Sequence, residues 1–140
     1  MVQRRYYRQI VIRYVATVPR EESADDDLDY IYQCLGLGDE RDTLGRAVFR
    51  AIVKASVRGE GISSRDLMQL SEVSQAAVIY HLNLFQRTGL VVKEGRNYYL
   101  RAPTLSLTLE EMQNDIERRF GLLKEKARKI EEKISSQPGR

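Results

Sequence analysis

The chain has 140 residues, of which 42% are hydrophobic and 31% are charged, a size that favours one compact domain with extensions. No apolar run approaches the roughly 20 residues that span a bilayer, and Arg4, Arg5 and Arg8 interrupt the segment in which a secretory signal would be apolar. The single cysteine, Cys34, excludes an internal disulfide, so we expect an intracellular, cytoplasmic protein.

The net charge of +3 is distributed unevenly. Residues 1–20 carry +5, residues 21–42 carry −8, residues 43–102 carry +5 and residues 103–140 carry +1. A polyanion would be attracted to the middle segment. The acidic segment is explained by a helix start, since carboxylates stabilise the first turn of a helix, and an acidic interaction patch is the alternative.

Residues 3–18 alternate apolar and polar side chains with many β-branched residues, which predicts a strand ended by Pro19. A single strand with unpaired backbone groups is not stable. We therefore expect it to pair with its equivalent in a dimer or with the sheet of the hairpin predicted near residues 90–101. Arg4, Arg5, Arg8 and Arg13 would then add DNA or partner contacts.

Two helices are predicted next. Ser23 can cap the first, whose apolar residues recur at helical spacing from Leu28 to Leu35, and Gly36 and Gly38 end it. The second should run from about residue 42 to residue 58, capped by Asp42 or Thr43. Its expected buried residues are Leu44, Val48, Ala51, Ile52 and Ala55.

Residues 62–102 contain the densest pattern. Ser63 or Ser64 can cap a short helix to about residue 70, with Leu67 and Leu70 facing inward. After a turn at residues 71–73, Ser74 can cap a helix that ends before Gly89. Residues 90–93 and 98–101 then form a hairpin around a turn at residues 94–97. This order predicts a winged helix-turn-helix.

The helix over residues 74–88 has two distinct faces. Val78, Leu82 and Phe85 share one face and should be buried. The opposite face has no acid, small side chains at its start and then polar and cationic ones, as a helix that enters the major groove requires. The predicted DNA-binding residues here are Ser74, Gln75, Ala76, Ile79, Tyr80, Asn83 and Arg87.

Further DNA contacts are expected on both sides of this helix. Ser64 and Arg65 begin the preceding helix, where a hydroxyl, a cation and a helix N-terminus suit a phosphate. Lys93, Arg96 and Asn97 surround the tip of the hairpin, which we expect to touch the backbone or the minor groove.

The segment SQAAVIYHLNLFQRTGLVV resembles the recognition-helix signature of ArsR-like winged-helix repressors, especially the archaeal ones. The resemblance covers about residues 43–102. It implies a repressor that binds pseudo-palindromic operators as a dimer, with Gln75, Ala76, Ile79 and Tyr80 facing the bases. The matching positions are Ser74, Gln75, Val78, His81, Leu82, Gly89, Leu90 and Val91.

The chain departs from metal-sensing members of that family, which carry cysteine pairs or His/Asp/Glu clusters. Residues 64–70 contain no cysteine, and His81 is the single histidine, so we expect no cofactor and no metal unless two chains share a site. His81 should be packed and hydrogen-bonded, with a DNA contact or a pH switch as alternatives. Cys34 should lie in the core or in a subunit interface rather than act as a redox thiol.

The C-terminal segment predicts one long helix. Thr108 and Glu111 form a potential capping box after Leu107. Apolar residues then recur at gaps of three and four, which favours pairing with a second chain, while folding back on the same domain is the alternative. The predicted dimerisation residues are Leu109, Met112, Ile116, Phe120, Leu123, Ala127, Ile130 and Ile134.

The sequence therefore predicts an α+β, mostly α fold. Its parts are an extension (residues 1–42), a winged helix-turn-helix (43–102) and a dimerisation helix (103–140). We expect a sequence-specific transcriptional repressor that binds double-stranded DNA as a homodimer, with no membrane partner. No catalytic motif is present, so an enzyme is not expected. The alternatives are a winged-helix protein-interaction module of the transcription or chromosome machinery and an RNA-binding protein, for which Tyr98 and Tyr99 would be the test.

Overall fold

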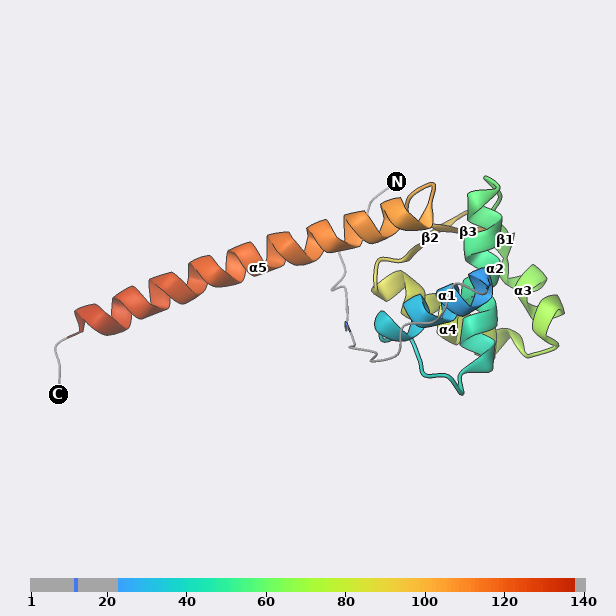
Figure 1. Cartoon of the computed structure of the whole chain (residues 1–140), viewed down its shortest axis with the longest axis horizontal. Coiled ribbons are helices and arrows are strands. Elements are labelled where there is room, and N and C mark those ends of the chain that lie inside the picture. The colour runs from blue at the N-terminus through green and yellow to red at the C-terminus, as the bar shows by residue number, and fades with distance from the viewer. Residues whose placement is uncertain (1–11, 13–22, 138–140) are drawn as a thin grey trace.

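The computed structural model describes Ile12 and residues 23–137. Within this part the chain is α+β and mostly helical, with a small three-stranded antiparallel sheet and a long C-terminal helix that projects from the globular part (Figure 1). The strand predicted over residues 3–18 lies outside the described residues apart from Ile12, which is exposed. No helix in residues 23–137 is long and apolar enough to cross a membrane.

The first two helices begin where the sequence predicts. Helix α1 (Ala24–Cys34) is capped by Ser23, whose Oγ accepts a hydrogen bond from the Asp26 amide at 3.1 Å. Helix α2 (Thr43–Val57) is capped by Asp42, whose Oδ1 accepts from the Gly45 amide at 2.9 Å. Both caps satisfy amides that have no partner inside the helix, so these starts are confirmed.

Helix α3 (Ser64–Ser71) begins with a capping box formed by Ser63 and Asp66. Leu67 is buried as predicted, but the inward placement of Leu70 is wrong, because 67% of its surface is exposed. Leu70 lies in the last turn of the helix, where no element of the described chain covers it, and Met68 is the residue that packs beside the core instead. Helical spacing shows which residues share a face, but it does not show how far a neighbouring element extends along that face.

Helix α4 (Gln75–Arg87) follows after Glu72, which adopts the left-handed conformation with φ 51°. Ser74 caps α4, since its Oγ accepts from the Ala77 amide at 3.3 Å. Gly89 follows the helix with φ 82°. This is the left-handed conformation expected of the glycine after a helix end. The predicted start and end of this helix are confirmed.

The sheet has the strand order β1-β3-β2. Strands β2 (Val91–Glu94) and β3 (Asn97–Leu100) form the predicted hairpin, but the turn is only Gly95–Arg96, because Glu94 pairs with Asn97. Strand β1 (Ile62–Ser63) pairs with β3 and is not predicted by the sequence, since two residues give no alternating pattern. A Cβ at Gly61 would lie 2.6 Å from Asn97 Cβ and from the Tyr99 ring, so this approach requires glycine.

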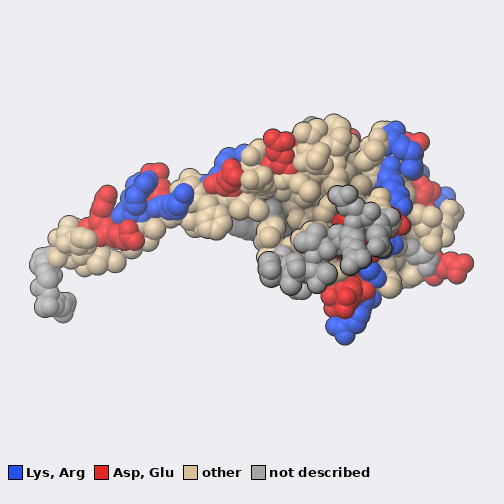
Figure 2. Space-filling view, viewed as in Figure 1, with Lys and Arg blue, Asp and Glu red and all other residues tan. Residues whose placement is uncertain are grey.

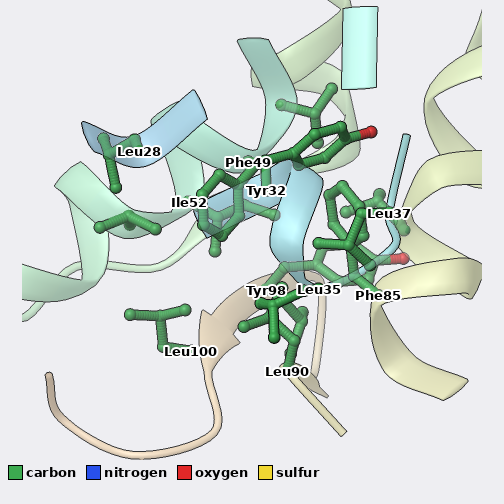
Figure 3. Packing of buried hydrophobic residues seen from close by; sticks show 14 of the residues in the cluster. Leu28, Tyr32, Leu35, Leu37, Phe49, Ile52, Phe85, Leu90, Tyr98 and Leu100 are labelled. Carbon is green, nitrogen blue, oxygen red and sulfur yellow. The ribbon is translucent and has the colours of Figure 1, made fainter. Parts of the chain in front are cut away.

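The core lies between α1, α2, α4 and the sheet (Figure 3). Three aromatic rings form its centre: Tyr32 lies 5.6 Å from Phe49 and 6.0 Å from Phe85 between centroids. Edge-on and tilted pairs at such separations are the favoured geometry for aromatic rings. These rings join α1 and α2 to α4, so the position of α4 depends on them.

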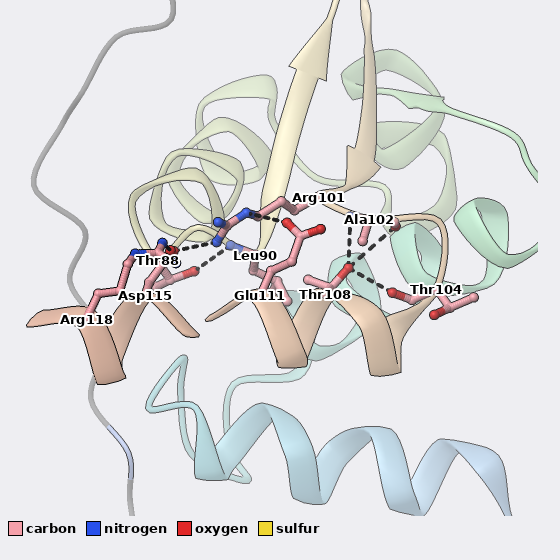
Figure 4. Close-up of polar contacts among 9 residues, drawn as sticks. All are labelled: Thr88, Leu90, Arg101, Ala102, Thr104, Thr108, Glu111, Asp115 and Arg118. Atoms are coloured by element: carbon pink, nitrogen blue, oxygen red, sulfur yellow. Dashed lines mark hydrogen bonds and ion pairs between the residues drawn. The ribbon is translucent and has the colours of Figure 1, made fainter. Parts of the chain in front are cut away.

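Helix α5 (Leu105–Ser136) begins about one turn before the predicted capping box. Thr104 is the cap, since its Oγ1 accepts from the Leu107 amide at 3.1 Å. Thr108 is buried instead: its Oγ1 accepts from the Ala102 amide at 3.0 Å and donates to the Thr104 carbonyl oxygen at 2.8 Å (Figure 4). The predicted capping box is therefore wrong. The helix already begins at Leu105, and the Thr108 hydroxyl accepts its hydrogen bond from the Ala102 amide in the preceding loop.

An ion-pair cluster fixes the first half of α5 to the sheet. Arg101, directly after β3, contacts Glu111 at 2.9 Å and Asp115 at 2.6 Å, and Asp115 also contacts Arg118 (Figure 4). Arg101 and Asp115 each have 18% of their side chains exposed, so solvent screens this pair less than a surface pair. The cluster holds α5 at a defined place on the domain.

Candidate interaction surfaces of α4 and α5

Helix α4 has one buried face and one exposed face. Val78, Leu82 and Phe85 are fully buried, as the sequence predicts. The opposite face is open to solvent, and 63% of the Tyr80 surface is accessible. No aspartate or glutamate occurs in α4. The exposed residues of this face are Gln75, Ala76, Tyr80, Asn83 and Arg87.

Two apolar residues at the edge of the exposed face are less available for contact with a partner molecule than the sequence indicates. Ile79 and Leu84 are partly buried and pack against the core. The sequence predicts that Ile79 faces the bases, and its packing leaves only part of its surface for such a contact. The exposed face of α4 is therefore mainly polar, which weakens the argument for a protein-interaction module on this helix.

Five of the nine cations of residues 43–102 form ion pairs within the chain. Arg46 and Arg50 both contact Asp29, at 3.1 and 2.6 Å, and the hydrogen bonds that Arg50 donates to Asp29 raise the pKa of Arg50. The other ion-paired cations of this segment are Lys54 with Asp25, Arg58 with Glu60, and Arg101 with Glu111 and Asp115.

The remaining four cations of this segment have no carboxylate partner among residues 23–137. They are Arg65 on α3, Arg87 at the end of α4, and Lys93 and Arg96 on the hairpin, and all four are exposed. The Nζ of Lys93 lies 5.6 Å from the centre of the Tyr98 ring. All four are positions that the sequence predicts to contact DNA.

Three polar residues of the predicted DNA-binding set have structural roles or restricted exposure. The Ser74 Oγ caps α4, so it is engaged by its own helix. Ser64 is the first residue of α3 and is half-buried, while the capping role belongs to Ser63. The sequence places Asn97 in the turn, but it begins β3 and its Cβ lies against Gly61.

A polar cluster beneath α4 is not predicted by the sequence. The Tyr32 hydroxyl donates to Asp42 Oδ2 at 2.5 Å, and burial together with this carboxylate raises the pKa of Tyr32. His81 Nε2 lies 3.7 Å from Asp42 Oδ1, and its buried Nδ1 has no hydrogen-bond partner among the described residues. His81 is packed as predicted, beside Phe85 and Tyr80, but within residues 23–137 its ring makes no hydrogen bond. The signal for this cluster is weak in the sequence, because Asp42 is already explained as a helix cap.

The tyrosines considered for RNA stacking and the single cysteine are all at least partly covered by the fold. Tyr98 is buried in the core, so its ring cannot stack on a base, and Tyr99 is half-buried beside Gly61. Cys34 is a half-buried free thiol at the end of α1. No group of three or more metal-ligating side chains occurs within the described part of the chain.

The apolar stripe of α5 divides into two parts. Leu109 and Met112 pack against the core of the same chain, and Ile116 is half-buried. Beyond Ile116 the helix leaves the domain and the stripe is exposed. Figure 2 shows charged atoms along one side of this projecting part and uncharged atoms along the other. The exposed stripe residues are Phe120, Leu123, Ala127, Ile130 and Ile134.

Comparison of the chain with models of protein families, with curated proteins and with solved structures gives no match. The two exposed surfaces, the polar face of α4 and the apolar stripe of α5, are therefore the features of the molecule that bear on its function.

Proposed function

We propose that the protein is a sequence-specific, double-stranded DNA-binding transcriptional regulator, a repressor that acts as a homodimer. In this proposal residues 43–102 form a winged helix-turn-helix, with α4 in the major groove and the β2–β3 hairpin on the backbone or the minor groove. The arrangement of α3, α4 and a hairpin after α4 agrees with that fold. The resemblance of residues 74–92 to ArsR-like repressors points in the same direction.

The observation that carries the proposal is the division of the cations in residues 43–102. Five form ion pairs with carboxylates of the same chain, and the four without such partners in the described residues lie on α3, α4 and the hairpin. A duplex is contacted by cations from several elements that flank an inserted helix. An acid-free helix with an exposed tyrosine and asparagine supplies the groups that hydrogen-bond to base edges.

The test is a binding titration of the full chain with a labelled duplex from upstream of its own gene, over a series of salt concentrations. We expect sub-micromolar affinity that survives competitor DNA and falls at least tenfold in Tyr80→Ala/Asn83→Ala. Arg87→Gln should weaken binding and lower the salt slope by about 0.9, the value for one phosphate contact. The matched control is Arg128→Gln, because Arg128 is also exposed but lies on the projecting half of α5.

Two outcomes would contradict the proposal. Absence of duplex binding would reject it. Equal binding to all duplexes, unchanged by Tyr80→Ala/Asn83→Ala, would reject α4 as the element that recognises sequence. Either result would favour a protein-interaction module, for which a partner search is the next experiment.

A further inference from the structure

The exposed part of the α5 stripe has the spacing of a coiled-coil seam. Its five residues are separated by gaps of 3, 4, 3 and 4, the heptad pattern of a and d positions. The seam runs from residue 120 to residue 134, which is 15 residues and about 21 Å between its ends at a rise of roughly 1.5 Å per residue. Charged residues border it on both sides, so the apolar surface is too narrow for a broad face embedded in lipid and fits one partner helix.

We propose that this seam pairs with the same seam of a second copy of the chain, parallel and in register, as a coiled coil of about two heptads. The inference rests on the homodimer included in the proposed function and restricts its interface to residues 120–134. Leu109 and Met112 do not contribute, because they are packed on their own domain. The seam residues are Phe120, Ala127 and Ile134 at a positions and Leu123 and Ile130 at d positions.

The charges beside the seam favour the parallel orientation. In a parallel pair each g residue lies near the e residue five positions further along the partner, so Lys126 meets Glu131 of the partner subunit. This attraction occurs twice in the dimer. The unfavourable pair, Arg119 with Lys124 of the partner subunit, also occurs twice.

An antiparallel pair has a less favourable balance of charge. There g residues meet g residues, and Arg119, Lys126 and Lys133 are all cations. When Leu123 lies opposite Ala127 of the partner subunit, each Arg119 meets a lysine and the two Lys126 side chains meet each other. At the same offset the two Lys124 side chains also meet each other, so four repulsive pairs oppose the two attractive ones between Lys124 and Glu131 of the partner subunit.

The first experiment measures the mass of the full chain in solution over a range of concentrations, by sedimentation equilibrium. We expect a dimer that dissociates on dilution, since the seam is short. Leu123→Ser should weaken the dimer at least tenfold, while Leu122→Ser should leave it unchanged. The two leucines are adjacent and similarly exposed, at 55% and 62%, but Leu122 lies off the seam. Equal circular dichroism of the two variants would show that both keep the helix.

A second experiment determines the orientation with a disulfide. In a Cys34→Ser background, Ala127→Cys should form a disulfide-linked dimer under mild oxidation, because equivalent a positions face each other in a parallel, in-register pair. In the antiparallel pair the two cysteines are displaced by about four residues, roughly 6 Å of helix, beyond the reach of a disulfide without backbone movement. Arg128→Cys, on the outer side of the helix, is the control that should remain unlinked.

A charge exchange tests the orientation independently. Lys126→Glu should weaken the dimer, and Lys126→Glu/Glu131→Lys should restore it, because the exchange preserves the parallel pair. The antiparallel pair would not be restored, since the second change places two lysines together.

Several outcomes would overturn the inference. These are a monomer at all concentrations, a dimer insensitive to Leu123→Ser, or co-sedimentation of a monomer with anionic vesicles. Failure of the DNA proposal is distinct, because Tyr80→Ala/Asn83→Ala should keep the dimer while losing duplex binding.

Discussion

Helix α4 and the projecting half of α5 are both amphipathic, but the fold covers opposite faces. In α4 the apolar face is buried by its own domain, so a polar, acid-free face meets solvent. In α5 beyond Ile116 no described element lies against the helix, so the apolar stripe itself is exposed. The difference teaches that the exposed face, rather than amphipathicity as such, indicates the kind of partner. A polar cationic face suits a nucleic acid, and a narrow apolar seam suits a helix.

The largest expected effect is on the free energy of unfolding, when a phenylalanine is replaced by alanine in α4 and, for comparison, in α5. Phe85 is a fully buried ring that contacts Tyr32 and Phe49, and Phe85→Ala should lower the free energy of unfolding by about 3–5 kcal/mol. The ring of Phe120 is 59% exposed. Phe120→Ala should therefore change that free energy by only about 0.5 kcal/mol or less. Urea denaturation of both variants in a Leu123→Ser background excludes the contribution of the dimer. Equal losses would show that Phe120 is covered within its own chain.

A smaller loss of stability is expected in the first turn of α5, which is attached to the domain. Thr108→Val keeps the shape of the side chain but leaves the buried Ala102 amide without its acceptor, which should cost about 1–3 kcal/mol of stability. Thr43 is exposed on α2 and provides the matched control. Thr43→Val should change stability by only about 0.5 kcal/mol or less. Thermal unfolding monitored by circular dichroism compares the two, and equal stability of both variants would contradict the role assigned to the hydroxyl.

The smallest expected effect is a gain in the stability of α5. Gly121 lies within the exposed part of α5, where an added Cβ would meet nothing within 4 Å. Because glycine is a weaker helix former than alanine, Gly121→Ala should stabilise this part of the helix by about 0.5–1 kcal/mol and slow its amide hydrogen exchange. The dimer should be kept or strengthened, because Gly121 lies off the seam. A weaker dimer in Gly121→Ala would place Gly121 inside the interface.

The sequence predicts well those features that depend on neighbouring residues. The caps at Ser23, Asp42 and Ser74 and the conformation of Gly89 are confirmed, because each requires only a suitable side chain within about one turn. The two-residue strand β1 and the exposure of Leu70 depend on neighbours distant in the sequence, which periodicity does not show. The role of Thr108 depends on the loop before α5, so the pattern that indicates a capping box there is misleading.

The candidate DNA-binding surface shows the same limit. The exposed and buried faces of α4 follow from helical spacing and are confirmed. The division of the cations is not visible in the sequence, because Asp29 pairs with arginines 17 and 21 residues away. Its formation depends on the packing of α1 against α2. Counting charges along residues 43–102 therefore predicts an attractive segment, while tertiary structure decides which four cations remain available.

Helix α5 continues without interruption from the edge of the domain to Ser136, so a small change of its angle at the domain moves its far end by a larger distance. Asp115 is the last residue of the Arg101 cluster on the domain side, and from there to Ser136 the helix is about 30 Å long at roughly 1.5 Å per residue. A tilt of the helix by about 10° at Asp115 would displace its far end by about 5 Å, which exceeds the spacing of about 3.4 Å between successive base pairs of B-DNA. If the chain binds DNA as the proposed dimer joined through α5, the angle of the helix at Asp115 would change the distance between the two half-sites.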